Sequence, residues 1–167
     1  MAGGVEAARA AVSSDVDRVV ELAAALRAEL VEMRGGSLWA ATRATHMDVA
    51  PARAARHYAE LAEGAGTTLV VGTIDGVVVG YGTARVEVLG DGRRVATIDE
   101  VYVEPGAREV GVGEVVLDAL GAWAAAEHCD GVDAFALPGH RAAKNFFEAH
   151  GFRARLLVMH RGVDSAR

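Results

Sequence analysis

A chain of 167 residues with 51% hydrophobic and 24% charged residues has the composition of one folded domain rather than of a disordered segment. Its formal net charge of −6 argues against a general nucleic-acid binder, because phosphate contacts need a basic surface. No apolar run is long enough to cross a membrane, and the first residues lack the basic and apolar segments of a secretion signal, so we expect a cytoplasmic protein without a membrane partner.

The first elements in chain order are a strand and a helix. Residues 1–8 show no pattern, and we expect them to form a disordered end before a single domain over residues 9–167. A short strand over residues 8–12 leads to Ser13-Ser14-Asp15, which is typical of a helix N-cap. Valines and leucines then recur at helical spacing until Gly35-Gly36, where we expect the helix to end. Pro51 suits the start of a second helical piece.

Three strands follow as a meander. Residues 67–74 and 77–89 read as strands joined by the tight turn Asp75-Gly76, and a second turn over residues 90–92 leads to a strand over 95–103. Gly80 and Gly82 lie inside the middle strand. Glycines there mark a bulge, a close approach of another backbone or a bend, and we expect a bend.

The stretch from Ala96 to Trp123 organises the rest of the chain. Pro105 ends its strand, and apolar residues at helical spacing from Val112 onward predict a long amphipathic helix. The loop between them has glycines at alternate positions and reads Arg108-Glu109-Val110-Gly111-Val112-Gly113. Such a backbone lets an anion approach closely, and the N–H groups at a helix start face it, so the loop predicts a phosphate or pyrophosphate site.

The two most familiar phosphate motifs do not match this loop. A P-loop would need Gly-Lys-Ser or Gly-Lys-Thr at its end, and the loop contains none. A dinucleotide fingerprint would need a third glycine where Val116 stands, and a shorter connection from strand to loop.

The last part of the chain predicts a strand over residues 132–137, a helix over 139–150 that stops at Gly151, and a final strand over 153–161. The strand over 132–137 follows a strand–helix crossover, so it should lie parallel to the strand over 95–103. The sequence therefore predicts one α/β domain with a mixed sheet.

Cysteine and histidine usage predicts no further chemistry. Cys129 is the single cysteine, so no internal disulfide forms, and we interpret it as a small residue at a packed helix end rather than a nucleophile. The six histidines show no close spacing typical of metal ligands, so we expect no metal site.

The anion loop fits the pattern Arg/Gln-x-x-Gly-x-Gly/Ala, and it resembles the acyl-CoA pyrophosphate loop of the GNAT superfamily of N-acyltransferases. Residues 143–152, AKNFFEAHGF, resemble a helix end of the same family, Ala-x-x-Phe-Tyr-Glu-x-x-Gly-Phe. The resemblance covers roughly residues 9–160. It implies an α/β (α+β) fold whose sheet is mixed and mostly antiparallel, contains a parallel, splayed strand pair, and is flanked by helices.

The resemblance also implies a function. An N-acetyltransferase of this family would move an acetyl group from acetyl-CoA, its cosubstrate, to a primary amine of a small molecule or peptide, by direct attack in a ternary complex. The residues implied to bind CoA are Val101, Tyr102, Val103, Arg108, Glu109, Val110, Gly111, Val112, Gly113, His140 and Lys144. The alternative is a non-catalytic domain that binds acyl-CoA as a sensor or regulator.

Two acids are candidates for the general base. Glu100 stands where family members often carry this base, and Asp99 is the second candidate. Strand alternation places the two on opposite faces. Other members use an acid three residues earlier, where this chain has Thr97, which cannot serve. For Glu100, a solvated or ion-paired strand carboxylate is the open alternative.

Two residues depart from the family pattern. Phe147 stands where many members have a tyrosine that protonates the leaving thiolate, and His140 where many have an asparagine. Tyr102 and His140 are candidate substitutes for the missing proton donor. In the interrupted helical region that lines the acceptor site of the family, Arg34 and Trp39, together with Tyr58 of the second helical piece, are candidate contacts, and ordinary core and surface roles stay open for them.

The apolar run Leu156-Leu157-Val158-Met159 is a candidate interface for a homodimer. The same run could be an inward-facing strand.

Overall fold

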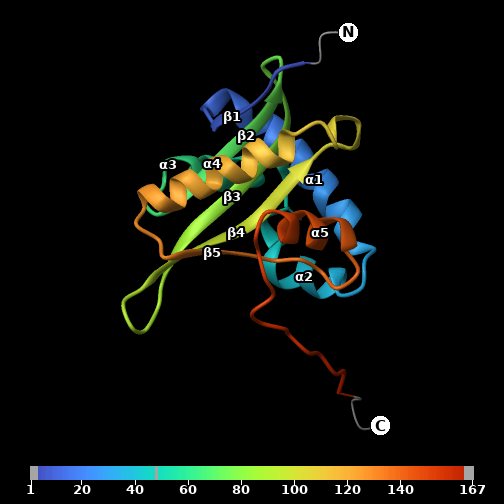
Figure 1. Ribbon diagram of the computed structural model, residues 1–167. Coiled ribbons are helices and arrows are strands. Elements are labelled where there is room, and N and C mark those ends of the chain that lie inside the picture. Colours follow the sequence, from blue (N-terminus) through green and yellow to red (C-terminus); the bar gives the residue numbers. More distant parts are fainter. Residues whose placement is uncertain (1–3, 48, 164–167) are drawn as a thin grey trace.

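The sheet of the computed structural model, which describes residues 4–47 and 49–163, contains five strands in the order β1-β2-β3-β4-β5 (Figure 1). The strands β1 (Glu6–Ala10), β2 (Thr67–Ile74), β3 (Val77–Val88) and β4 (Arg94–Val103) pair antiparallel in succession. The short strand β5 (Gly131–Ala134) pairs parallel with β4. The predicted mixed, mostly antiparallel sheet is confirmed.

Helices cover both faces of this sheet. They are α1 (Val16–Val31), α2 (Gly36–Arg43), α3 (Pro51–Glu63), α4 (Val112–Ala126) and α5 (Arg141–Ala149), with single 3-10 turns η1 (Ser13–Asp15), η2 (Thr45–Met47) and η3 (Pro105–Ala107). The long helix α4 lies across one face, and α1 and α3 pack against the other (Figure 1). Each face has its own apolar core, one around Leu26 and Tyr58 and one around Val116 and Leu120. Within the described ranges, no helix combines the length and apolar character needed to span a membrane.

Two boundaries near the N-terminus differ from the prediction. β1 starts at Glu6, so residues 6–8 belong to the sheet instead of to a disordered end, because they form ladder pairs with β2. Residues 1–3 of that predicted end lie outside the described residues. Gly36 opens the helix α2 directly after the left-handed Gly35, and a Cβ at Gly36 would meet the carbonyl oxygen of Leu30. The glycine pair is therefore a sharp corner between two helices.

Glycines in the sheet allow α4 to approach it closely. A Cβ at Gly82 would lie 2.8 Å from a methyl carbon of Leu120, and a Cβ at Gly72 would lie 2.7 Å from side-chain atoms of both Val112 and Val116. A Cβ at Gly80 would lie 2.8 Å from the carbonyl oxygen of Tyr102. Close approach accounts for the glycines of β3. The register of β2 and β3 also shifts beside Gly80, and a bulge of this kind bends its strand, so the structure does not exclude the bend that we expected.

The predicted last strand over residues 153–161 is wrong. Residues 152–163 contain neither helix nor strand, although residue types there favour a strand. A strand needs a ladder partner for its backbone groups, and among the described residues this segment finds none. Its apolar run is exposed, from 72% at Leu156 to 88% at Met159.

Candidate active site

The parallel pair β4–β5 splays open. The two strands pair only from Val95 to Ile98 on β4, and β5 ends at Ala134. Beyond Ile98, no other described strand pairs with this side of β4, so the backbone of Val101, Tyr102 and Val103 has no ladder partner there. This is the splayed pair that the family resemblance implies.

The predicted anion loop lies between the end of β4 and the start of α4. Glu109 and Gly111 have left-handed backbones, with φ of 66° and 96°, and α4 begins at Val112. The loop is solvent-exposed at Arg108, Glu109 and Val110. An open loop that ends in the N-terminus of a long helix suits an anion, because unpaired N–H groups and the positive dipole end face it.

The structure explains the need for glycine at position 113 differently from the sequence. A Cβ there would lie 3.3 Å from the ring of Phe146 on α5, which is tighter than an ordinary contact. The glycine therefore lets α5 pack against the start of α4. Room for a ligand is a separate effect, and it applies more directly to Gly111.

Arg108 is anchored to α1 by a residue that the sequence did not single out. Its guanidinium donates to both carboxylate oxygens of Glu29 at 2.9 Å, and its Nε donates to the carbonyl of Val103 at 2.8 Å. The hydroxyl of Tyr102 donates to the same Glu29 at 2.8 Å. Glu29 thus holds the anion loop and the splayed part of β4 together.

The pKa values of the two candidate proton donors, Tyr102 and His140, differ from those of the free side chains. Burial and the carboxylate of Glu29 raise the pKa of Tyr102 to about 12, which makes its hydroxyl a weaker acid. His140 precedes α5, and burial lowers the pKa of its ring below the ordinary value. Lys144 is exposed on α5 and forms an ion pair with Glu148 at 2.7 Å.

Glu100 is buried and fully engaged, with only 5% of the residue exposed. Its Oε2 accepts hydrogen bonds from the hydroxyls of Tyr81 at 2.6 Å and Tyr58 at 2.9 Å. Its Oε1 lies 2.7 Å from Nε2 of His46. Because a carboxylate only accepts, Nε2 of His46 is the donor, and Nδ1 keeps its lone pair. Of the alternative that the sequence left open, a solvated carboxylate is thus excluded, whereas an ion-paired carboxylate is not, because Glu100 contacts His46.

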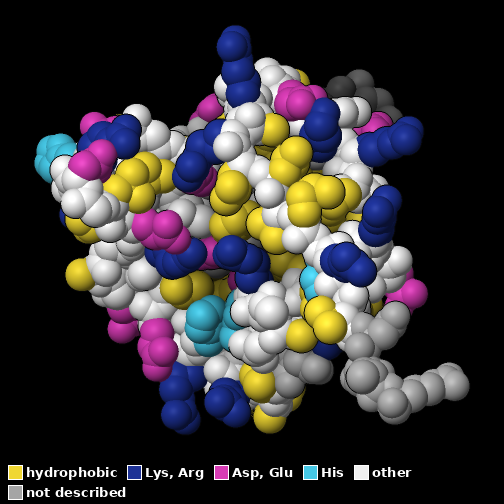
Figure 2. All heavy atoms as spheres, turned by 90° about the horizontal axis from the view of Figure 1, so that it is seen from below, with side chains coloured by type: hydrophobic (Ala, Val, Ile, Leu, Met, Phe, Trp, Pro, Cys, Tyr) yellow, Lys and Arg dark blue, Asp and Glu magenta, His cyan; other side chains and the backbone are white. Residues whose placement is uncertain are grey.

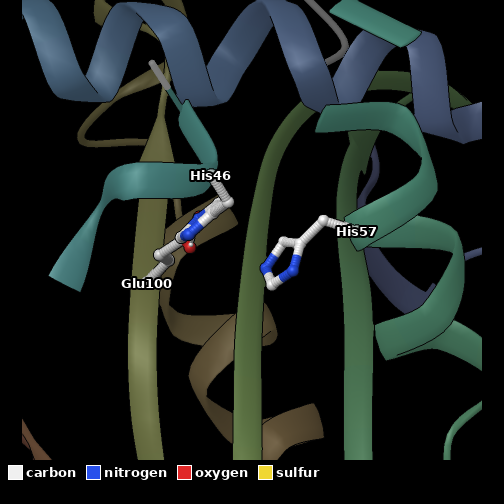
Figure 3. Close-up of side chains that lie close together, drawn as sticks. All are labelled: His46, His57 and Glu100. Carbon is white, nitrogen blue, oxygen red and sulfur yellow. Dashed lines mark hydrogen bonds and ion pairs between the residues drawn. The ribbon is translucent and has the colours of Figure 1, made fainter. Parts of the chain in front are cut away.

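Burial shifts the pKa values of three residues near Glu100, namely Tyr58, Tyr81 and His57. Burial, followed by the charge of Glu100, raises the pKa values of Tyr58 and Tyr81 above that of a free phenol, so both hydroxyls stay protonated and donate. Burial, followed by His46, lowers the pKa of His57, which favours the neutral ring. Figure 3 shows His57 beside the pair of His46 and Glu100.

His46, His57 and Glu100 meet one criterion for a metal site, since their ligand atoms lie within 4.8 Å of one another. The two rings are stacked, however, with centroids 4.1 Å apart and planes 27° from parallel. Imidazole binds a metal in the plane of its ring, and the lone pairs of two stacked rings do not converge on one point. The set does not fit a metal ion in this arrangement, and the expectation of no metal stays a prediction.

Asp99 lies in a different environment. It accepts from Arg85 at 2.9 Å in an ion pair in which both side chains are 35% exposed. Burial raises its pKa, while Arg85 acts in the opposite direction. The β3–β4 register shifts between Thr83 and Ala84, which face Glu100 and Ile98, so strand alternation does not pass unbroken through Asp99 as we expected.

A shallow pocket of about 280 Å³ opens beside the Glu100 cluster. It is lined by Thr45, His46, Val49, Arg53, Arg56, His57 and Glu60. A second hollow of about 410 Å³ shares Thr45 with it and extends along α1 and α2.

The structure brings only one of the three predicted acceptor contacts into this cluster. Tyr58 bonds to Glu100, whereas Trp39 packs against the core and Arg34 is exposed and lines neither hollow. The cluster also contains residues that sequence reasoning missed, namely His46, His57 and Tyr81. Tyr81 had a usable signal, because the Asp75-Gly76 turn and the following turn set the register that puts β3 next to Glu100.

Residues 36–152 match the model of the acetyltransferase (GNAT) family. No curated protein gives a significant match in sequence.

Several solved structures share the fold. A transcriptional regulator from Bacillus halodurans C-125 is 20% identical with a TM-score of 0.69, covering 94% of this chain and 100% of that chain. The aminoglycoside N-acetyltransferase AAC(6')-Iy in complex with CoA is 16% identical with a TM-score of 0.73, covering 98% and 97%. The same enzyme with a bisubstrate analogue, CoA-S-monomethyl-acetylneamine, is 16% identical with a TM-score of 0.71, covering 95% of this chain and 99% of that chain. At these identities the likeness shows the fold alone.

Proposed function

The chain belongs to the acetyltransferase (GNAT) family, and on this premise we propose that it moves an acetyl group from acetyl-CoA to a primary amine of a small molecule or peptide. The observation that carries the proposal is the hydrogen-bonded pair of His46 and Glu100 beside an open pocket. Glu100 lies on β4, the strand that leads into the anion loop. CoA and a CoA–amine analogue are bound in structures that share the fold, which supports the same pair of substrates.

The donor would lie between β4 and α5. The loop from Arg108 to Gly113 and the start of α4 would hold the pyrophosphate, because an anion is stabilised at a helix N-terminus. The backbone of Val101 to Val103, which has no strand partner on the β5 side, would hold the pantetheine arm as an additional strand and offer an N–H to the thioester carbonyl. The carbonyl of Val103 already accepts from Arg108. His140, directly before α5, and Lys144, on α5, would flank the donor.

The base would be a dyad rather than Glu100 alone. Both oxygens of Glu100 are occupied and the residue is 5% exposed, so the amine does not reach it directly. His46 lines the pocket, and 18% of its side chain is exposed. We therefore assign proton removal from the ammonium to Nδ1 of His46, with Glu100 fixing the ring and stabilising its charged form.

The reaction then follows by direct attack. The free amine nitrogen bonds to the acetyl carbon, and the thioester oxygen takes up the negative charge. The carbon–sulfur bond then breaks as the carbonyl re-forms, and the nitrogen, positively charged after the attack, gives up one proton to leave the neutral amide. The leaving thiolate takes up a proton as CoA departs, and a thiol of pKa ~8.5 is a tolerable leaving group even without a strong donor.

Thiol release tests this function. Acetyl-CoA and the protein are incubated with a panel of amines, amino acids, polyamines and aminoglycosides, and free thiol is measured. The proposal expects thiol release that depends on at least one amine. Binding of acetyl-CoA without turnover on any amine would instead favour the alternative, an acyl-CoA sensor.

Phe147→Tyr is expected to raise turnover. Phe147 lies against the rings of Phe146 and Phe152, with centroids 5.5 Å and 5.2 Å away. A hydroxyl at this position would restore a proton donor near the departing sulfur, an effect worth ~10²–10⁴-fold when well placed. Turnover at saturating acetyl-CoA measures it, with Phe152→Tyr as the control. An equal gain in the control, or a lower rate with unchanged CoA affinity, would contradict the assignment.

We also propose that the protein forms a homodimer through its C-terminal segment. The exposed run of Leu156 to Met159 extends toward the face shown in Figure 2, on which a broad apolar area lies among Lys and Arg side chains. Exposed apolar patches of this kind mark interaction sites. Light scattering should give a dimer, and Val158→Asp should give a monomer with unchanged secondary structure. A monomeric natural chain at high micromolar concentration would rule the interface out.

A further inference from the structure

The pocket beside His46 is built largely from one face of α3. Arg53, Arg56, His57 and Glu60 all line it, and their spacing of three or four residues places them on the same side of the helix. The opposite wall is the turn η2, which carries His46. A molecule in the pocket therefore lies close to Arg53 and Arg56, which are within about one helical turn of His57 on α3.

Among the residues that the structure describes, no carboxylate engages the two arginines of this pocket. Other arginines do form ion pairs, among them Arg9, Arg18, Arg85, Arg93, Arg94, Arg108 and Arg155. Within the described part of the chain, neither Arg53 nor Arg56 has such a partner, and both are exposed. Glu60 is the single acid among the lining residues, so the lining itself is positive while the histidines are neutral. The carboxylate of Glu100 is buried behind His46 and does not line the pocket.

We infer that the amine acceptor carries an anionic group, a carboxylate or a phosphate, which Arg53 and Arg56 bind while the amine lies at His46. The inference rests on the proposed function and names its substrate class. Guanidinium groups pair with both anions in a bidentate geometry. The pocket volume of about 280 Å³ limits the bound part to a small molecule or a peptide end.

The net charge of the whole chain does not oppose this inference. A net charge of −6 would favour cationic amines by long-range steering. At physiological ionic strength, charges beyond about 8 Å are largely screened. At contact distance, the charges of Arg53 and Arg56 therefore have more effect on the bound group than the net charge of the chain.

Matched acceptor pairs test the inference. Amino acids are compared with their C-terminal amides, and amino-sugar phosphates with the same sugars lacking phosphate, by kcat/KM at saturating acetyl-CoA. We expect the anionic member of at least one pair to be preferred by about tenfold or more, the size of one charge-assisted hydrogen bond. The pair that shows the preference identifies carboxylate or phosphate as the group.

Two variants locate the preference. Arg53→Gln and Arg56→Gln should each raise KM for the anionic acceptor about tenfold, with little change in kcat, in KM for its neutral partner or in CoA affinity. Arg93→Gln is the control, because it removes the same charge from the distant β3–β4 turn, where Arg93 pairs with Asp91.

The outcomes separate the two claims. Turnover of amines with equal kcat/KM for both members of every pair would overturn the anion site and leave the proposed function intact. A preference that persists in both arginine variants would also overturn it. If no amine in the panel increased thiol release, the proposed function would be overturned instead.

Discussion

Glu100→Gln is expected to lower turnover by ~10²-fold or more while CoA affinity stays nearly unchanged. Glutamine keeps the shape of the side chain and can still accept hydrogen bonds from Tyr58 and Tyr81. It removes the negative charge that stabilises His46 when this ring takes the proton of the amine. Steady-state kinetics across pH measure the loss, and the rising limb of the profile should flatten if the dyad controls it.

The control for Glu100 is its neighbour. Asp99→Asn removes the same kind of charge from an ion pair with Arg85 and should cost much less turnover. His46→Ala should resemble Glu100→Gln, because both interrupt one proton path. Equal losses in the Asp99 and Glu100 variants, or none in either, would remove Glu100 from the base role. Thermal unfolding shows whether each variant folds.

Gly111→Val is expected to weaken CoA binding by ~10²-fold. Gly111 has φ of 96°, a backbone conformation that a β-branched residue does not adopt without strain. The loop would therefore reshape just where α4 presents its N–H groups, and contacts to the pyrophosphate worth about 1.5–3 kcal/mol each would be lost. Calorimetry with CoA measures the change directly.

Gly106→Val is the matched control for the loop. Gly106 lies in η3, shortly before the same loop, has no positive φ, and nothing lies within 4 Å of a Cβ built there. Its substitution should leave CoA affinity within about twofold. We also expect Gly113→Val to lose CoA binding. Because this change disturbs the contact with Phe146, its effect includes altered packing of α5 against α4. Unchanged CoA affinity in Gly111→Val would sink the loop assignment.

The parts of the fold that the sequence predicted are those set by local patterns. The Asp75-Gly76 turn fixes the β2–β3 hairpin, and the change of period after Pro105 fixes the start of α4. The anion loop was found for the same reason, since its glycines and the helix behind it are adjacent in sequence. The parallel pairing of β5 followed from the handed crossover rule.

The parts that it missed depend on pairs of distant residues. His46 and Glu100 are 54 positions apart, and the turn η2 that carries His46 has no periodic pattern. Glu29 looks like any exposed acid of α1 until the fold brings Arg108 to it. The C-terminal run was read as a strand because its residues favour one, yet β structure also needs a free neighbour at the right place.

The measurement that tests the central claim most directly follows the acetyl group itself. The protein is mixed with acetyl-CoA that carries an isotope label in its acetyl group, with and without an amine that supports thiol release. The masses of all products and of the protein are then measured by mass spectrometry. Direct transfer predicts label in the amine as an amide, in an amount equal to the CoA released, and an unlabelled protein. Labelled protein that forms without the amine and passes its label on, or CoA release that leaves the label as free acetate, would contradict it.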